Sequence, residues 1–262
     1  MISIVREMSS GFRVLFPTGR FRFLLIVLAM LGAVISVSEL LVMKFFMGVV
    51  TREGEIERDR FIALGAGILI FFLITRLAQY YQRVYRVRAF GRAFKGLRKT
   101  RKKGAGNPEW AMAFELSSVL THATQLGAIL LFFVLLEPYF ALFNLAILVL
   151  VLIFIARLFI VQIELQQLMR TERDGKQARP ERRYGQRIKA AETGALASGA
   201  GMIILLAALL YLSYNGDISL TNTLIFFLGS RLQNGSLTNI SRSLMRYAKA
   251  KAGVSARADE DE

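Results

Sequence analysis

The chain has 262 residues, of which 54% are hydrophobic, and 34 Lys and Arg outweigh 19 Asp and Glu to give a formal net charge of +15. Because the apolar residues gather into long runs with the basic residues between them, the composition indicates a polytopic membrane protein rather than a water-soluble enzyme. Membrane orientation explains the basic excess before nucleic-acid binding does. The chain has no cysteine, which excludes disulfides, thiolate catalysis and cysteine-ligated metal sites.

Six apolar runs are long enough to cross a membrane as helices, since a span needs ~20 mainly apolar residues. They cover residues 23–50, 61–82, 119–136, 139–161 and 195–214, and a sixth begins at Ile218. The first run is longer than the apolar core of a cleavable signal peptide, so we expect it to be retained. Only Glu137 and Pro138 separate the third and fourth runs, which predicts a tight antiparallel hairpin. The predicted fold class is therefore all-α, a polytopic membrane protein with six transmembrane helices.

Basic residues are concentrated on one side of these spans. Segments 76–109 and 157–192 carry eleven and nine Lys or Arg, and residues 1–22 carry four, whereas residues 213–220 carry only the charge of Asp217. Cytoplasmic segments of membrane proteins are enriched in Lys and Arg. We therefore expect both termini and both long basic segments to be cytoplasmic, and the three short links to face outward.

The two long basic segments keep apolar residues at helical spacing, which indicates that they extend the spans as helices. Two short helical cytoplasmic loops are thus predicted at residues 83–118 and 162–194, within a transmembrane domain that covers 23–257. Their turns are expected at residues 104–108 and 179–180, where glycine and proline interrupt the pattern.

The two ends of the chain differ from the spans. Residues 1–22 place apolar side chains on one helical face, which predicts a cytoplasmic, interfacial elbow helix; a disordered basic tail is the alternative. Residues 258–262 are short and acidic, and they are predicted to form a disordered tail.

This layout resembles the transmembrane domain of type I ABC exporters, in which two helical intracellular loops follow the second and fourth of six spans. Residues 115–122 (ELSSVLTH) look like the segment that enters that family's third span, and residues 247–257 (YAKAKAGVSAR) look like the end of its sixth helix. The resemblance implies cytoplasmic termini, a homo- or heterodimer with another six-helix subunit, and an ATP-driven cycle.

The sequence also departs from that family. Phe114, Val119 and Ala123 occupy places where the family often has Gly, Arg and Asp. The arms of each loop would reach only ~25 Å at helical rise, roughly half the family's length. No G-x-x-x-x-G-K-[ST] phosphate loop occurs. The chain is therefore expected to hold no cofactor itself, and ATP with magnesium would act only through a separate subunit.

Catalytic and metal chemistry have little support in the sequence. His122 is the only histidine, so no two-histidine zinc site can form within one chain, and a packed or hydrogen-bonded role is favoured. For Glu164 and Glu192, ion pairing with nearby arginines is favoured over acid–base work. We predict no catalytic residue and no metal site, and a membrane-embedded enzyme is the weakest of the functional hypotheses.

The sixth run contains the most informative polar residues. Steps of three and four place Arg231, Asn234, Thr238 and Arg242 on one helical face. Arg231 would lie ~20 Å deep by helix rise, and a charge at that depth needs a polar cavity or a partner. The functional interpretation is a substrate pathway along this face. The alternative is that the span ends early and Arg231 extends to the lipid headgroups.

Two further patterns suggest contacts. Small residues at the start of the fifth run have the spacing that permits close helix contact, either for dimerisation or within one chain; they are Gly194, Ser198, Gly199 and Gly201. A basic run is expected to contact anionic lipid headgroups, and nucleic-acid binding is not predicted because no aromatic residues interleave with it. This run consists of Arg98, Lys99, Arg101, Lys102 and Lys103.

The leading functional hypothesis is the membrane subunit of an ABC exporter-like transporter that works with a separate ATP-binding subunit on an amphipathic or anionic substrate. The alternative is a structural or accessory protein that keeps the exporter-like helix order and associates with a larger membrane complex. In either case we expect contact with membrane lipid and a location in the bacterial inner membrane.

Overall fold

The computed structural model describes residues 19–51, 57–93, 108–171 and 180–261, and within these residues the chain is helical apart from short links and contains no strand. The all-α prediction is therefore confirmed. The helices are α2 (Gly19–Val50), α3 (Arg58–Ala93), α4 (Pro108–Leu136), α5 (Pro138–Thr171), α6 (Pro180–Tyr214) and α7 (Leu220–Asp261).

Proline and glycine set several helix boundaries. Pro108, Pro138 and Pro180 are each the first residue of a helix, where the missing N–H costs nothing and the fixed φ suits the first turn. The predicted hairpin is confirmed, because Glu137 alone separates α4 from α5. In the α6–α7 link, Gly216 has a φ of 78°, a conformation that a side chain would disfavour.

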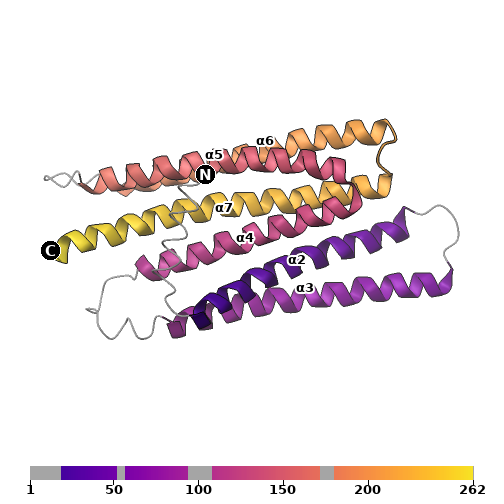
Figure 1. The fold of residues 1–262 in the computed structure, drawn as a ribbon, viewed down its shortest axis with the longest axis horizontal. Coiled ribbons are helices and arrows are strands. Elements are labelled where there is room, and N and C mark those ends of the chain that lie inside the picture. Colours follow the sequence, from indigo (N-terminus) through magenta and orange to yellow (C-terminus); the bar gives the residue numbers. More distant parts are fainter. Residues whose placement is uncertain (1–18, 52–56, 94–107, 172–179, 262) are drawn as a thin grey trace.

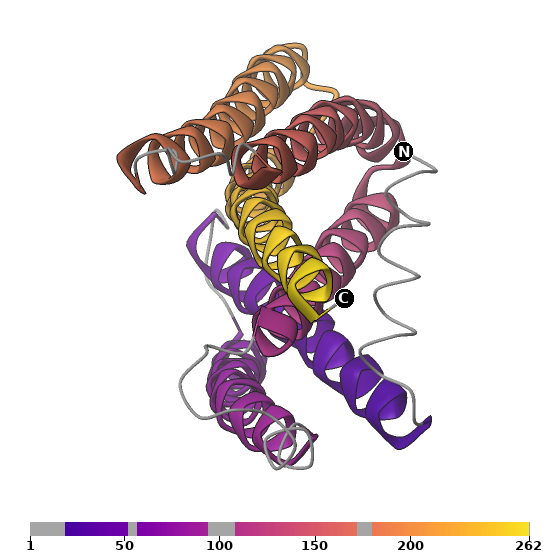
Figure 2. The ribbon, with the colours of Figure 1, turned by 90° about the vertical axis from the view of Figure 1, so that its left-hand side faces the viewer.

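The helices run alternately up and down in one elongated bundle (Figure 1). At one end, which we call the short-link end, lie the connections from α2 to α3, α4 to α5 and α6 to α7. At the other, which we call the basic end, α2, α4 and α6 begin and α3, α5 and α7 finish. Figure 2, seen from the basic end, shows α7 between the α5–α6 pair and the α2–α3 pair.

Five helices, α2 to α6, are long and apolar enough to cross a membrane. The chain thus has the architecture of a polytopic membrane protein. The sixth expected span corresponds to α7, a helix of 42 residues whose composition is too polar to join that group. The sequence therefore predicted the position of this helix, while its apolar character was overestimated.

Two apolar clusters hold the bundle together. Near the short-link end, the buried rings of Phe133, Phe140 and Phe226 pack against one another, with centroids 4.6 to 5.8 Å apart. Nearer the basic end, Phe159 of α5 contacts Tyr247 of α7. In both clusters α7 supplies an aromatic ring, so this polar helix is packed as a core element.

Small residues on α6 face neighbouring helices of the same chain. A Cβ at Gly194 would lie 2.1 Å from the hydroxyl oxygen of Ser241 on α7, and one at Gly201 would lie 3.0 Å from Val151 on α5. Ser198 bonds to α7 through Asn234. The small-residue spacing therefore serves packing within the chain at these positions.

The predicted ends of the chain are described in part. Residues 1–18, most of the expected elbow, lie outside the described residues, and Gly19 already belongs to α2. The expected acidic tail, 258–262, is helical as far as Asp261, where α7 ends.

Candidate functional site

Four helices line a partly open cavity of about 540 Å³, which we call the recess. Its wall is formed by α2, α3, α4 and α7, and much of it is polar. The charged residues and carboxamides in the wall are Glu39, Gln79, Gln82, Arg83, Gln125, Arg231 and Asn239. Apolar side chains complete the wall, so the recess offers both polar and apolar surface to an occupant.

The recess lies deep in the bundle. Glu39 is eleven residues before the end of α2, Gln125 eleven before the end of α4, and Arg231 eleven after the start of α7. At helical rise each is about 17 Å from the short-link end, which is near the centre of a hydrocarbon layer of ~30 Å. Polar groups at this depth need protein partners or water.

Hydrogen bonds fix the wall on the side of α2 and α3. Gln79 donates from Nε2 to Glu39 Oε1 over 3.1 Å, and Arg76 donates from Nη1 to Gln79 Oε1 over 3.3 Å. Gln82 donates to the carbonyl oxygen of Leu28 over 3.2 Å. One carboxylate of the recess is thus linked through a carboxamide to an arginine.

A second set of contacts fixes the wall on the side of α4 and α7. His122 Nδ1 lies 2.7 Å from Gln125 Oε1, and the hydroxyl of Ser236 donates to the same oxygen over 3.4 Å. The hydrogen-bonded role expected for His122 is confirmed, and it orients the carboxamide of Gln125 at the recess.

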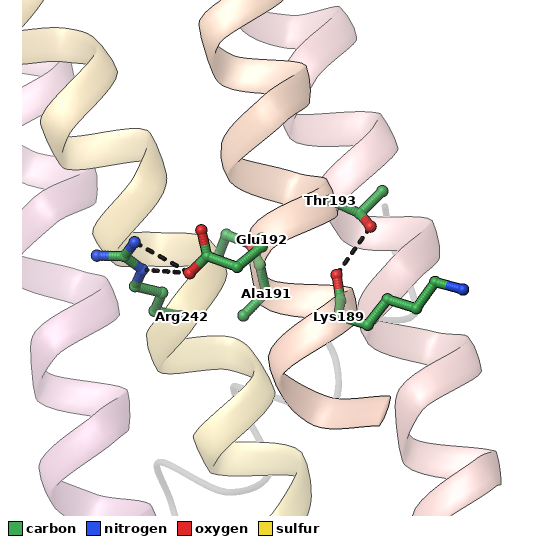
Figure 3. A network of polar contacts seen from close by, with 6 residues as sticks. Lys189, Ala191, Glu192, Thr193 and Arg242 are labelled. Atoms are coloured by element: carbon green, nitrogen blue, oxygen red, sulfur yellow. Dashed lines mark hydrogen bonds and ion pairs between the residues drawn. The ribbon is translucent and has the colours of Figure 1, made fainter. Parts of the chain in front are cut away.

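The predicted stripe on α7 is divided between two neighbours. Arg231 lines the recess. Asn234 faces α6, where its Oδ1 accepts a hydrogen bond of 2.5 Å from Ser198, and Thr238 is half-buried. Arg242 donates to Glu192 Oε1 from Nη2 over 3.0 Å and from Nε over 3.3 Å (Figure 3). The structure therefore does not bring the four residues to one site.

Ion pairing of Glu192, which the sequence favoured, is confirmed by its contact with Arg242. A further pair joins Arg246 of α7 to Glu115 of α4, with 2.8 Å between Nε and Oε1. Arg86 of α3 donates to the carbonyl oxygen of Phe114, and its guanidinium lies 3.8 Å from the centre of the Phe114 ring. These contacts fasten α7 and α3 to α4, and α7 to α6, towards the basic end.

Sequence reasoning missed a deeply buried polar contact between α5 and α7. Asn144 of α5 and Gln233 of α7 exchange two hydrogen bonds of 2.9 and 3.0 Å, and both side chains are buried. The signal was a single carboxamide in an otherwise apolar stretch of α5, which marks a helix interface in membrane proteins.

Other predicted residues lie elsewhere. The basic run of Arg98, Lys99, Arg101, Lys102 and Lys103 falls outside the described residues. In the part of the chain that the structure describes, no group of three or more His, Asp or Glu could hold a metal ion. No protein-family model matches the chain, and no curated protein matches its sequence.

Cysteine labelling tests whether water enters the recess. Gly235 lines it, and a Cβ there meets nothing within 4 Å, so Gly235→Cys leaves the packing intact. We expect a membrane-impermeant maleimide to label this variant, because the chain has no cysteine of its own. Ala200→Cys, at similar depth on the exposed apolar face of α6, is expected to stay unlabelled. Equal labelling of the two variants would contradict a water-accessible recess.

Proposed function

We propose that the chain is the membrane-spanning subunit of an ABC exporter-like transporter and that it works with a separate ATP-binding subunit. Both termini and the basic end lie in the cytoplasm. The substrate is amphipathic or anionic, and the recess forms part of its route. A second six-helix subunit, identical or different, completes the transporter in the bacterial inner membrane.

The observation that carries this proposal is the recess itself. It combines a mid-membrane arginine, Arg231, with carboxamides from α3 and α4, and intramembrane charges of this kind mark substrate or ion routes. The wall of the recess includes α7. In helix order α7 corresponds to the sixth helix of type I ABC exporters, which lines the substrate pathway in that family. The placement of the long links, after α3 and α5, also agrees with that family.

The second candidate is an accessory protein that binds another membrane complex. It is favoured by α3, which packs mainly along α2 and leaves large apolar side chains such as Leu69, Phe72 and Leu73 exposed. Such a face suits lipid, and it equally suits a protein partner in the membrane.

Purification with partner identification separates the two candidates. The chain is extracted in a mild detergent, copurifying chains are identified, and the complex is reconstituted into vesicles with a fluorescent anionic amphiphile. We expect an ATP-binding chain to copurify and ATP to drive movement of the amphiphile. Arg231→Gln should slow this movement while the complex stays intact, and Arg157→Gln, an exposed site on α5 away from the recess, should not.

Two results together would contradict the transporter proposal and support the accessory role. The complex would contain another membrane protein but no ATP-binding chain, and ATP would not change the movement of the amphiphile in vesicles.

A further inference from the structure

We propose that the recess binds one anionic amphiphile, whose phosphate or carboxylate headgroup is held jointly by Arg83 of α3 and Arg231 of α7. This deepens the proposed function and rests on it only in treating the recess as part of the substrate route. Arg83 is identified as a candidate from the structure alone, since its place in the sequence does not distinguish it from the other arginines of the basic segment.

Arg83 of α3 and Arg231 of α7 have no side-chain partner among the described residues, since neither makes a hydrogen bond or an ion pair there, although both line the recess. Arg242 and Arg246, on the same helix as Arg231, are each paired with a carboxylate. A guanidinium matches a phosphate or carboxylate with two parallel hydrogen bonds, so an anion in the recess would supply what the protein does not.

Among the described residues of the recess wall, Glu39 is the only carboxylate, and it already has a partner. Glu39 accepts from Gln79, and Gln79 accepts from Arg76. Counting Arg83 and Arg231 against Glu39, the wall carries a net positive charge. The helices around the recess have a low dielectric and screen charge weakly, so a positive recess attracts an anion.

The apolar part of the wall indicates that the anion belongs to an amphiphile. Ile35 and Met43 of α2 and Leu228 and Leu232 of α7 line the same recess as the two arginines. A volume of about 540 Å³ is within the range of ligand sites, ~300–1,000 Å³. The recess is open rather than enclosed, so a tail longer than the cavity can continue outside it.

Native mass spectrometry of the purified full-length chain tests this inference. The protein is incubated with equimolar phosphatidylglycerol, which is anionic, and phosphatidylcholine of the same acyl chains, which is zwitterionic. A separate sample adds millimolar inorganic phosphate to distinguish a free anion from a lipid headgroup. We expect the wild-type chain to retain phosphatidylglycerol in preference, and phosphate not to displace it.

Four variants locate the binding. Arg83→Gln and Arg231→Gln should each reduce retention of phosphatidylglycerol about tenfold, the effect of losing one charge-assisted hydrogen-bonding partner. Glu39→Gln should increase retention, because it removes the opposing charge and keeps an oxygen to accept from Gln79. Arg157→Gln, outside the recess, should behave as wild type. The opposite signs of the Glu39 and arginine effects separate binding from a mere folding defect.

Equal retention of the two lipids by the wild-type chain would overturn the proposal, as would unchanged binding in both Arg83→Gln and Arg231→Gln. Displacement of the lipid by free phosphate would overturn the proposal that the occupant is an amphiphile and would indicate a site for a free anion. The measurement uses neither ATP nor a partner chain. The absence of an ATP-binding subunit would therefore contradict the transporter proposal without affecting the lipid-binding result.

Discussion

Asn144→Leu is expected to destabilise the bundle by about 1–3 kcal/mol, because it leaves the carboxamide of Gln233 buried without its partner. Asn144 and Gln233 exchange two hydrogen bonds between α5 and α7, and neither has access to water. Leucine keeps the branched shape of asparagine and is larger, so the substitution leaves no cavity at position 144. The measurement is the unfolding midpoint in detergent, followed by the fluorescence of Trp110, the only tryptophan.

The double variant Asn144→Leu/Gln233→Leu separates pairing from packing. Because it removes both polar partners, it should be more stable than Asn144→Leu alone. Asn222→Leu, a half-buried position on α7 with no described side-chain hydrogen bond, is the control and should shift the midpoint little. Gln233→Leu is measured alone as well. If the stability lost by the double variant equals the sum of the losses in Asn144→Leu and Gln233→Leu, the contact between Asn144 and Gln233 is not a stabilising pair.

Gly194→Ala is expected to destabilise the contact between α6 and α7 by about 1–3 kcal/mol, the usual cost of overpacking a filled interior. The added Cβ would lie 2.1 Å from Ser241 Oγ and 3.0 Å from Ser241 Cβ. Ser241 is fully buried and donates to the carbonyl oxygen of Ala191, so it cannot swing away without losing that bond. Size-exclusion profiles and the unfolding midpoint in detergent measure the effect.

The chain offers a rescue and a control for this prediction. Ser241→Gly removes both clashing atoms, so Gly194→Ala/Ser241→Gly should recover part of the lost stability. At Gly199, five residues along α6, an added Cβ meets nothing within 4 Å, so Gly199→Ala should be neutral or stabilising through helix propensity. Equal destabilisation by Gly199→Ala and Gly194→Ala would refute the packing explanation.

The elements that the sequence predicted well are those determined by local signals. Long apolar runs marked α2 to α6, and the turns expected at 104–108 and 179–180 fell beside helix starts, although Pro108 and Pro180 themselves belong to the helices. Each depends on residues that are neighbours in the chain, so no knowledge of the tertiary structure was needed. The family resemblance stays a proposal, because nothing beyond its sequence motifs and helix order supports it.

The candidate site was less predictable because it depends on which helix faces which. Rows of residues at steps of four are inclined to a helix axis, so a stripe from Arg231 to Arg242 passes from one neighbour to the next. Periodicity detects such a row without showing where it changes partner. For the same reason Gln233 was overlooked although it makes the buried contact with Asn144, because it directly precedes Asn234 and faces another side of α7.

Hydropathy was also a poor guide to the position of α7. This helix is the least apolar of the six, yet it packs against α2, α4, α5 and α6. Several of its polar residues are matched by partners on those helices, namely Asn144, Glu192 and Glu115. Composition within one helix cannot show that its polar groups are satisfied by others.

The links are shorter at one end of the bundle than at the other, so the helix ends are held more closely at the short-link end. Those at the short-link end have seven, one and five residues, against fourteen and eight at the basic end. The single residue Glu137 holds the ends of α4 and α5 within about 7 Å, and Thr51 bonds to Thr221 over 2.6 Å to tie α2 to α7 at the same end. Helices that tilt as rigid rods therefore pivot there. For a rod the length of α2, a tilt of about 10° would displace its far end by ~8 Å and a residue at the depth of Arg231 by only ~3 Å. A small tilt around an occupant of the recess would thus produce a larger displacement at the basic end.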